Sequence, residues 1–249
     1  MQRARLTYFD MRGRAEAIRL LLHAHRSEFE DERIASRAEW AALQPTTPFG
    51  VLPIYESPEV QLAESHAILR HLSRRLVSAL HDEVVLAELD VAHEALAESQ
   101  EDLWRFNWRT NYFDRLEWYA QETLRPRLHR LQRWLMRGRS ASKEWFGTAF
   151  SHVDCLAFCY LDEIDAFFPD VLAEFGELAA LRLRVASLPA ISKYLQSASR
   201  PVVFGLGRMG PKVDPRIRIP GGCIYSTPWS DPVDLAEVAR TQRRLTKPG

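Results

Sequence analysis

The fold of this chain is decided by two neighbouring stretches, GVLPIY at residues 50–55 and LAESHAI at residues 62–68. The first is patterned as a strand but contains Pro53, and a proline inside such a run marks an edge, a bulge or a cis peptide. At a cis bend, Leu52 turns its backbone N–H and C=O outward, where an extended ligand pairs with them as a strand would. In the second stretch, Ser65 opens a helix whose N-terminal N–H groups suit a carboxylate. Together they predict a site for a small, extended, anionic peptide.

Strand and helix patterns alternate through the first part of the chain. Strands are predicted at 4–9 and 28–34, helices at 14–25, 37–43 and 65–76, and a hairpin of two short strands across 56–59. A strand, a helix and a second strand in so short a span imply a right-handed parallel crossover. The order βαβ–α–ββα therefore predicts an α/β domain at 1–78 with a small, mixed, four-stranded sheet.

After this point the periodicity becomes purely helical. Long amphipathic helices are predicted at 83–106 and 114–137, the second kinked by Pro126, and further helices at 153–168, 171–186 and 189–197. The helix at 153–168 is almost wholly apolar and is therefore central, and Ser151 with Asp154 forms a capping box at its start. We expect an all-helical domain at 82–204, followed at 205–249 by an irregular basic extension with one candidate short helix at 234–245.

Composition excludes several classes of function. The 33 Lys and Arg balance the 33 Asp and Glu, so no global charge recruits nucleic acid or an anionic membrane, and no apolar run approaches the ~20 residues of a membrane span. The N-terminus lacks the apolar core of a signal peptide, and the three cysteines have neither disulfide nor zinc spacing. We expect a cytoplasmic protein with no metal. The GLGRMG run at 205–210 spells a dinucleotide fingerprint, but Pro211 forbids the helix that must follow it.

Five motifs of the α/β domain then stand together in one order. They are LTYF at 6–9, RGRAEAIR at 12–19, EW at 39–40, PFGVLP at 48–53 and ESHAI at 64–68. The helical domain adds the capping box, FPDVL at 168–172 and LPAI at 188–191. Over about residues 4–200 this pattern resembles the glutathione S-transferases, and within them the sigma class that includes glutathione-dependent prostaglandin D synthases. The resemblance implies a thioredoxin-like N-terminal domain, an all-α C-terminal domain, a homodimer, and glutathione as co-substrate.

The resemblance also assigns the catalytic residues. Tyr8, at the end of the first strand, matches the tyrosine that donates a hydrogen bond to the glutathione sulfur and favours the thiolate. Without the flanking motif, Tyr8 reads as a strand aromatic in the core. Arg14 supports the sulfur site electrostatically on the same precedent, while a solvated helix charge is an equal alternative.

The resemblance also implies which residues bind glutathione, position by position. Leu52 and Val51 offer backbone beside a cis Pro53, while Glu64 and Ser65 hold the glutamyl end. Trp40 and Gln44 lie at the glycine end, where Gln44 replaces an expected lysine and removes one positive charge. Asp102 is expected to reach the glutamyl ammonium of a partner subunit, with Glu101 as the rival and a solvated acid as the alternative.

The acceptor pocket is predicted between the two domains. Its expected walls are Met11, Trp104, Trp108, Tyr112, Cys159 and Tyr160. The interleaved Arg and Trp of 104–113 also resemble a nucleic-acid stacking surface, but net neutrality favours a wall for an apolar ligand. A further hypothesis is that the tail, through Tyr225 and Trp229, covers this pocket.

The predicted function is therefore a glutathione transferase in which the thiolate attacks an electrophilic, largely apolar substrate. The alternatives are a glutathione-dependent isomerase of the prostaglandin D synthase type, peroxide reduction by the same thiolate, and a non-enzymatic binding protein on the same fold.

Overall fold

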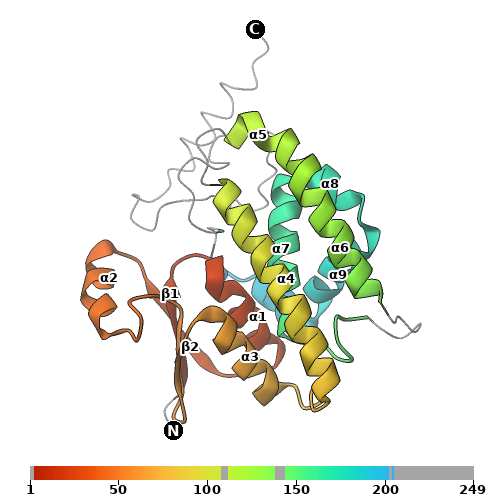
Figure 1. Ribbon diagram of the computed structural model, residues 1–249. Coiled ribbons are helices and arrows are strands. Elements are labelled where there is room, and N and C mark those ends of the chain that lie inside the picture. The colour runs from red at the N-terminus through yellow and green to blue at the C-terminus, as the bar shows by residue number, and fades with distance from the viewer. Residues whose placement is uncertain (1–2, 108–111, 138–143, 202–203, 205–249) are drawn as a thin grey trace.

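A computed structural model describes residues 3–107, 112–137, 144–201 and 204 of the 249-residue chain. An α/β layer comes first and a helical layer follows it (Figure 1). The strands are β1 (Ala4–Phe9), β2 (Phe29–Ile34), β3 (Ile54–Glu56) and β4 (Gln61–Ala63). The helices are α1 (Glu16–Ala24), α2 (Arg37–Leu43), α3 (Ser65–Leu76), α4 (Glu83–Asn107), α5 (Tyr112–Tyr119), α6 (Arg125–Met136), α7 (His152–Phe167), α8 (Pro169–Ala173), α9 (Gly176–Ser187) and α10 (Pro189–Leu195).

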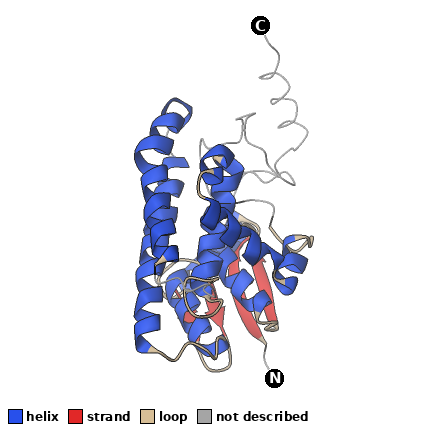
Figure 2. Cartoon of the chain, turned by 90° about the vertical axis from the view of Figure 1, so that its right-hand side faces the viewer, coloured by secondary structure: helices blue, strands red, loops and turns tan. Residues whose placement is uncertain are grey.

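The sheet has the order β2-β1-β3-β4. β1 runs parallel to β2 and antiparallel to β3, and β3 pairs antiparallel with β4, so the predicted mixed four-stranded sheet is confirmed. The strand expected over 50–55 starts only at Ile54, because the residues before it bend through a cis peptide. Helices lie beside this sheet at one end of the molecule (Figure 2). Just after the C-terminal end of β1, Gly13 N–H donates to Phe204 O and Arg14 pairs with Glu101 of α4, so this end of the strand adjoins the helical layer.

The central helix α7 joins the two layers. Nearly all of its side chains are buried, and it packs against α1, α4 and α9. The predicted capping box is present: Ser151 Oγ accepts from Val153 N–H at 3.3 Å, and Asp154 Oδ2 accepts from Ser151 N–H at 2.9 Å. Burial raises the pKa of Asp154 to about 6. The box fixes the start of the helix against which the first domain is placed.

Two of the predicted helices are interrupted. The helix expected over 114–137 consists of α5 and α6 with a π-helical turn at Ala120–Leu124 between them. Pro126 lacks the N–H of a regular α-helical bond, and the wider turn precedes it rather than a simple kink. The helix expected over 171–186 is likewise divided, into α8 and α9, because the chain leaves helical geometry at Phe175.

Candidate active site

Tyr8 lies near the C-terminal end of β1 and is almost fully buried, with 6% of its surface exposed. Its hydroxyl oxygen accepts a hydrogen bond from the backbone N–H of Arg14 at 3.2 Å. Gly13 makes this approach possible. It has φ +40°, and a Cβ added to it would lie 2.7 Å from the Tyr8 hydroxyl oxygen. The RGR turn therefore holds the phenol through its main chain and leaves no room for a larger residue at 13.

Burial raises the pKa of Tyr8 above its ordinary value, while the Arg14 N–H and the charges of Arg14 and Arg19 act in the opposite direction. The phenol is therefore protonated at neutral pH. Since its oxygen already accepts from Arg14, its O–H is the group available to donate to a ligand. A donor fixed in this way suits an anionic acceptor such as a thiolate.

The Leu52–Pro53 peptide is cis, the isomer expected from the sequence. Within the described residues, the N–H and C=O of Leu52 form no hydrogen bond, which leaves both for an extended ligand. Gln44 Nε2 donates to Gly50 O at 3.2 Å, so this side chain is attached to the loop that leads to Leu52. Val51, next to Leu52, is 40% exposed.

Ser65 is the first residue of α3 and is buried. The first helical bond there is donated by Ile68 N–H to Glu64 O at 3.0 Å, so the preceding N–H groups of the helix point out of its start. Glu64 is exposed and has φ +68°, a conformation that non-glycine residues adopt rarely and that clusters at functional sites. Ser65 therefore stands at a helix start whose first N–H groups have no helical acceptor.

Trp40 is half-buried and packs edge-on against Phe9, with ring centroids 5.4 Å apart. Phe9 in turn contacts the Tyr8 ring at 5.4 Å. The aromatic row therefore connects α2, which carries Trp40, to the strand that carries Tyr8. These contacts place the residues predicted for the glycine end and the sulfur end on neighbouring elements.

Glu101 and Asp102 face different sides of α4. Glu101 Oε2 accepts from the Arg14 guanidinium at 2.6 Å, whereas Asp102 Oδ2 accepts from Tyr119 O–H at 3.0 Å and lies 3.6 Å from Arg127 Nε. Consecutive helical residues differ by about 100° in direction. The structure thus places the rival carboxylate, Glu101, beside the candidate catalytic residue, while Asp102 is held within its own helical layer.

Comparison with known proteins decides the family. The glutathione S-transferase N-terminal domain model matches residues 4–74, and the C-terminal domain model matches 104–198. Glutathione S-transferase P of Caenorhabditis elegans is 31% identical over 82% of this chain and 98% of its own length. The chain belongs to the glutathione S-transferase family.

Two further relatives of this glutathione S-transferase bear on its class. Hematopoietic prostaglandin D synthase of Rattus norvegicus is 30% identical over 78% of this chain and 96% of its own. A solved Pi-class glutathione S-transferase of Onchocerca volvulus superposes with a TM-score of 0.73 at 27% identity, covering 78% of this chain and 93% of that one. The thioredoxin-like first domain and helical second domain expected from the motifs are thereby confirmed.

In the predicted acceptor region of this family member, Trp104 and Cys159 line one small space together with Phe204. Trp104 Nε1–H donates to both carboxylate oxygens of buried Glu163, at 3.1 and 3.0 Å, and the Arg14 guanidinium lies 5.0 Å from the Trp104 ring centroid. The space lined by Trp104, Cys159 and Phe204 measures about 10 Å³.

Other predicted pocket residues lie elsewhere. Met11 is buried, and its carbonyl accepts from Arg19 at 2.8 Å; neither it nor Tyr160 lines that space. Tyr160 is one residue along α7 from Cys159 and therefore faces another direction. Trp108 lies outside the described residues, as do the side chain of Tyr112, Tyr225, Trp229 and the whole of 205–249.

Three residues of the site were not assigned from the sequence. Gly13 belongs to the RGRAEAIR motif at 12–19, and its positive φ explains why glycine is needed there. Glu163 is a buried carboxylate on an apolar helix, and such a residue signals a partner. Phe204 ends an apolar Val-Val-Phe run, but its approach to Gly13 spans almost the whole chain and has no local signal.

Two surveys cover the described part of the chain. No helix in it is both long and apolar enough to span a bilayer. Nor do its His, Cys, Asp and Glu side chains form a group of three or more arranged to hold a metal ion.

Proposed function

We propose that this chain is a glutathione transferase in which Tyr8 stabilises the glutathione thiolate. The observation that carries the proposal is the buried Tyr8 hydroxyl, whose oxygen accepts from Arg14 N–H at 3.2 Å and whose proton is left to donate to sulfur. The thiol proton passes to solvent. The sulfur then forms a bond to the electrophilic carbon of an apolar substrate, and the leaving group departs with the electron pair of the broken bond.

The required shift is modest in energy. A free thiol with a pKa of ~8.5 is mostly protonated at neutral pH. To lower that pKa by about two units, the site must stabilise the thiolate over the thiol by about 2.7 kcal/mol. A hydrogen bond to a charged group supplies a free energy of this size. Positioning of the two reactants contributes the remaining acceleration.

The proposal extends to the remaining glutathione contacts, which are those that the family resemblance implies. Ser65 and the N-terminus of α3 bind the glutamyl carboxylate, and Glu64 accepts from the glutamyl ammonium. The Leu52 backbone pairs with the cysteinyl unit, beside Val51 and cis Pro53, while Trp40 and Gln44 contact the glycine end. The carboxylate from a partner subunit is assigned to Asp102, with Glu101 as the rival; within one chain Asp102 accepts from Tyr119 and Glu101 accepts from Arg14.

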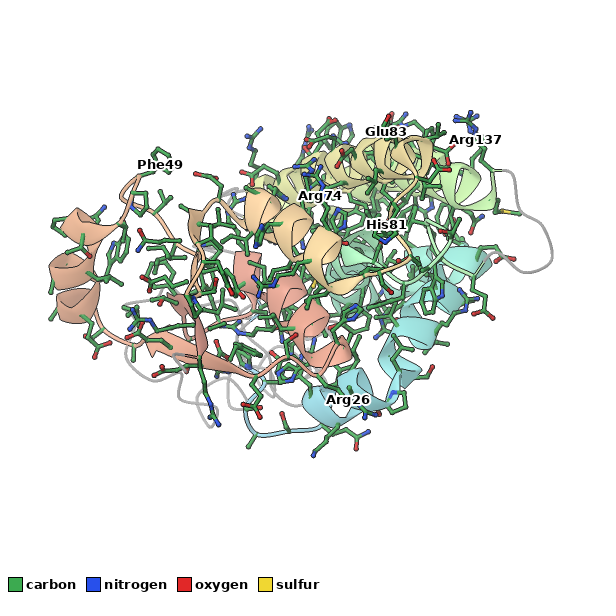
Figure 3. The ribbon with its side chains drawn as sticks, turned by 90° about the horizontal axis from the view of Figure 1, so that it is seen from below. Arg26, Phe49, Arg74, His81, Glu83 and Arg137 are labelled. Carbon is green, nitrogen blue, oxygen red and sulfur yellow. The ribbon has the colours of Figure 1, made fainter. Side chains whose placement is uncertain are left out.

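The proposal includes a homodimer. Phe49 is 71% exposed, and a groove of about 540 Å³ lies between α4 and α6. Its apolar lining is Val91, Ala92, Leu131 and Trp134, and charged side chains of Glu98, Glu122, Arg127 and Arg130 stand beside them. Phe49 and the ends of these helices, marked by Glu83 and Arg137, lie along one edge of the molecule (Figure 3). A two-fold axis on this side lets the Phe49 of each subunit enter the other's groove, so that one apolar contact is made twice.

The deciding experiment is a titration of bound glutathione, followed by thiolate absorbance in the ultraviolet. In the wild-type protein we expect the thiol to titrate well below ~8.5, and in Tyr8→Phe to return to that free value. Phe9→Tyr/Tyr8→Phe, which moves the hydroxyl to the neighbouring position, serves as a control for a phenol that is present but misplaced. Glutathione that binds with an unshifted thiol contradicts the transferase mechanism.

A non-enzymatic binding protein on the same fold is the second candidate. Its support is Gln44, which stands at a place where the motif has a lysine. Glutathione binding without turnover of any electrophile would favour it. Isomerisation, as in the prostaglandin D synthase relative, and peroxide reduction use the same thiolate and are distinguished by product analysis. We propose the cytoplasm as the location, since the free thiols of Cys155 and Cys159 suit a reducing compartment.

A further inference from the structure

Asp162 of α7 accepts hydrogen bonds from three arginines. Its Oδ2 accepts from Arg12 Nη1 at 3.3 Å and from Arg200 Nη2 at 2.9 Å, and its Oδ1 accepts from Arg182 Nη2 at 3.1 Å. The Asp162 side chain is 14% exposed, so water and salt screen these contacts little. The three arginines come from the turn after β1, from the segment after α10 and from α9. One carboxylate of the helical layer thus joins three separate parts of the chain.

Arg12 belongs to the turn that holds Tyr8. Its guanidinium also donates from Nε to Pro201 O at 2.9 Å. Two residues later, Arg14 N–H donates to the Tyr8 hydroxyl oxygen at 3.2 Å. Between them, Gly13 leaves no spare room, because a Cβ there would lie 2.7 Å from the same oxygen. A displacement of Arg12 therefore changes the contact at Tyr8.

A neutral side chain at position 162 would leave the three guanidinium groups without the anion that they share. The other two arginines each have a second carboxylate. They are Arg182, with Asp165 at 2.6 Å, and Arg200, with Glu16 at 2.8 Å. Both would stay paired, while the three positive charges would repel one another across the vacated position. Displacement of Arg12, together with its turn, relieves this repulsion.

We propose, on the basis of the proposed transferase function, that Asp162 is a positioning residue for the activation of glutathione. Through Arg12 it fixes the turn at 12–14, and the Arg14 N–H in that turn fixes the direction in which the Tyr8 O–H points. This route differs in sign from a direct electrostatic effect. A nearby negative charge by itself raises the pKa of a thiol, so its removal would lower that pKa, whereas loss of the positioned donor raises it.

The thiol pKa of bound glutathione separates these two routes. It is measured by thiolate absorbance in the full-length wild-type protein and in Asp162→Asn. We expect the substitution to raise the thiol pKa by about one unit, half of the shift ascribed to Tyr8, and to lower kcat/KM for the electrophile near pH 6.5 about fivefold. The pH profile of kcat/KM should move to higher pH by the same amount, which a loss of folded protein does not produce. An unchanged or lowered thiol pKa overturns the proposal.

Asp165→Asn is the matched control. Asp165 lies on the same helix, pairs with Arg182 at 2.6 Å and is 40% exposed. We expect its substitution to leave the thiol pKa unchanged, because the pair between Asp162 and Arg12 remains. If Asp165→Asn shifts the thiol pKa as far as Asp162→Asn does, the effect belongs to the charge of the region in general, and the proposal is overturned.

A double-mutant cycle tests the route through Arg12. Arg12→Gln should raise the thiol pKa by about as much as Asp162→Asn, and the double variant should raise it no further, because both substitutions break the same pair. Shifts that add in the double variant overturn this route. Should Asp162→Asn fail to fold, Arg12→Gln removes the contact from its other end, and an unshifted thiol in that variant overturns the proposal.

Amide hydrogen exchange distinguishes this inference from the proposed function. In the ligand-free protein, the Arg14 N–H should exchange about tenfold faster in Asp162→Asn than in wild type, relative to the amides of β1. If wild type binds glutathione with an unshifted thiol, the proposed function fails, while faster Arg14 exchange still supports the role of Asp162 in fixing the turn and an equal rate overturns it. If the wild-type thiol is shifted and Asp162→Asn changes neither its pKa nor the exchange rate, only the present inference fails.

Discussion

The two ends of the candidate site are built in different ways. The proposed glutathione end is built largely on main chain, namely the N–H groups at the start of α3, the backbone at Leu52 and the N–H of Arg14 that meets Tyr8, and a few side chains such as Tyr8 and Ser65 add to it. The acceptor end consists of side chains that come from distant parts of the chain, with Trp104 on Glu163 and Phe204 on Arg12. A main-chain site changes only when the backbone changes, whereas a side-chain site is altered by a single substitution. The first end is therefore suited to one constant ligand and the second to variable ones.

The largest expected effect is a loss of stability when the buried ion pairs behind the acceptor end are broken. Buried Glu16 accepts from Arg200 at 2.8 Å and from Tyr194 O–H at 3.0 Å, and this links α1 to the end of the helical layer. Glu16→Ala removes one of the two carboxylates that Arg200 contacts, the other being Asp162 at 2.9 Å, and leaves the Tyr194 O–H without this acceptor, so it should reduce the free energy of unfolding by about 3 kcal/mol. Urea denaturation measures this value.

The exposed pair Arg3–Glu28 provides the comparison for Glu16. Both side chains are more than two-thirds exposed, and Glu28→Ala should change stability by less than about 1 kcal/mol. Equal losses in Glu16→Ala and Glu28→Ala would show that the buried network does not hold the layers together.

The next effect tests the main-chain end. Gly13→Ala places a methyl carbon 2.7 Å from the Tyr8 hydroxyl oxygen at a residue with φ +40°. We expect kcat/KM to fall about 10²-fold, the scale of losing one preorganised donor, and the thiol pKa of bound glutathione to rise. Gly176→Ala is the control, since nothing lies within 4 Å of a Cβ there. Full activity in Gly13→Ala would mean that the exact placement of the phenol is unimportant.

A smaller effect concerns the histidines between α3, α4 and α7. His93 Nε2 lies 2.8 Å from His66 Nδ1, and burial lowers the pKa of His93 to about 2 and that of His152 to about 4. Because the unfolded chain binds these protons near pH 6.5, stability is full above that pH. It falls as the pH decreases toward 4, by at most about 1.4 kcal/mol per pH unit for each histidine.

Urea midpoints at pH 5.5 and 7.5 check this dependence. Asp154 changes the stability in the opposite direction: burial raises its pKa to about 6, so protonation at lower pH removes the destabilisation caused by its buried charge. The effect of this one carboxyl is smaller than that of the two histidines. His152→Leu should flatten the slope, while His81→Gln, at an exposed position, should not. A protein that is more stable at pH 5.5 than at 7.5 would contradict the assignment.

The sequence predicted the local structure around the proposed glutathione end better than that of the acceptor end, because the signals for the first are local. Pro53 after Leu52, Ser65 at a helix start and the capping box of Ser151 and Asp154 are local signals, and each appears in the structure where expected. The sheet order follows from the same short-range patterns.

The acceptor end depends on contacts between residues far apart in the chain. The position of Phe204 against Gly13 and the orientation of Glu101 toward Arg14 are set by how the layers pack. A choice between the consecutive helical residues Glu101 and Asp102 requires the phase of α4, which the periodicity of the sequence defines only approximately.

The π-helical turn at Ala120–Leu124 has a consequence for how the helical layer tolerates insertions and deletions. A π turn contains one residue more than the α-helical turn it replaces. Removing one residue there would restore a continuous helix and rotate α5 by about 100° relative to α6. Tyr119 would then leave both the stacked ring of Phe106, 3.9 Å away, and its bond to Asp102. The extra residue thus keeps α5 in phase with α4 while α6 keeps its own buried face.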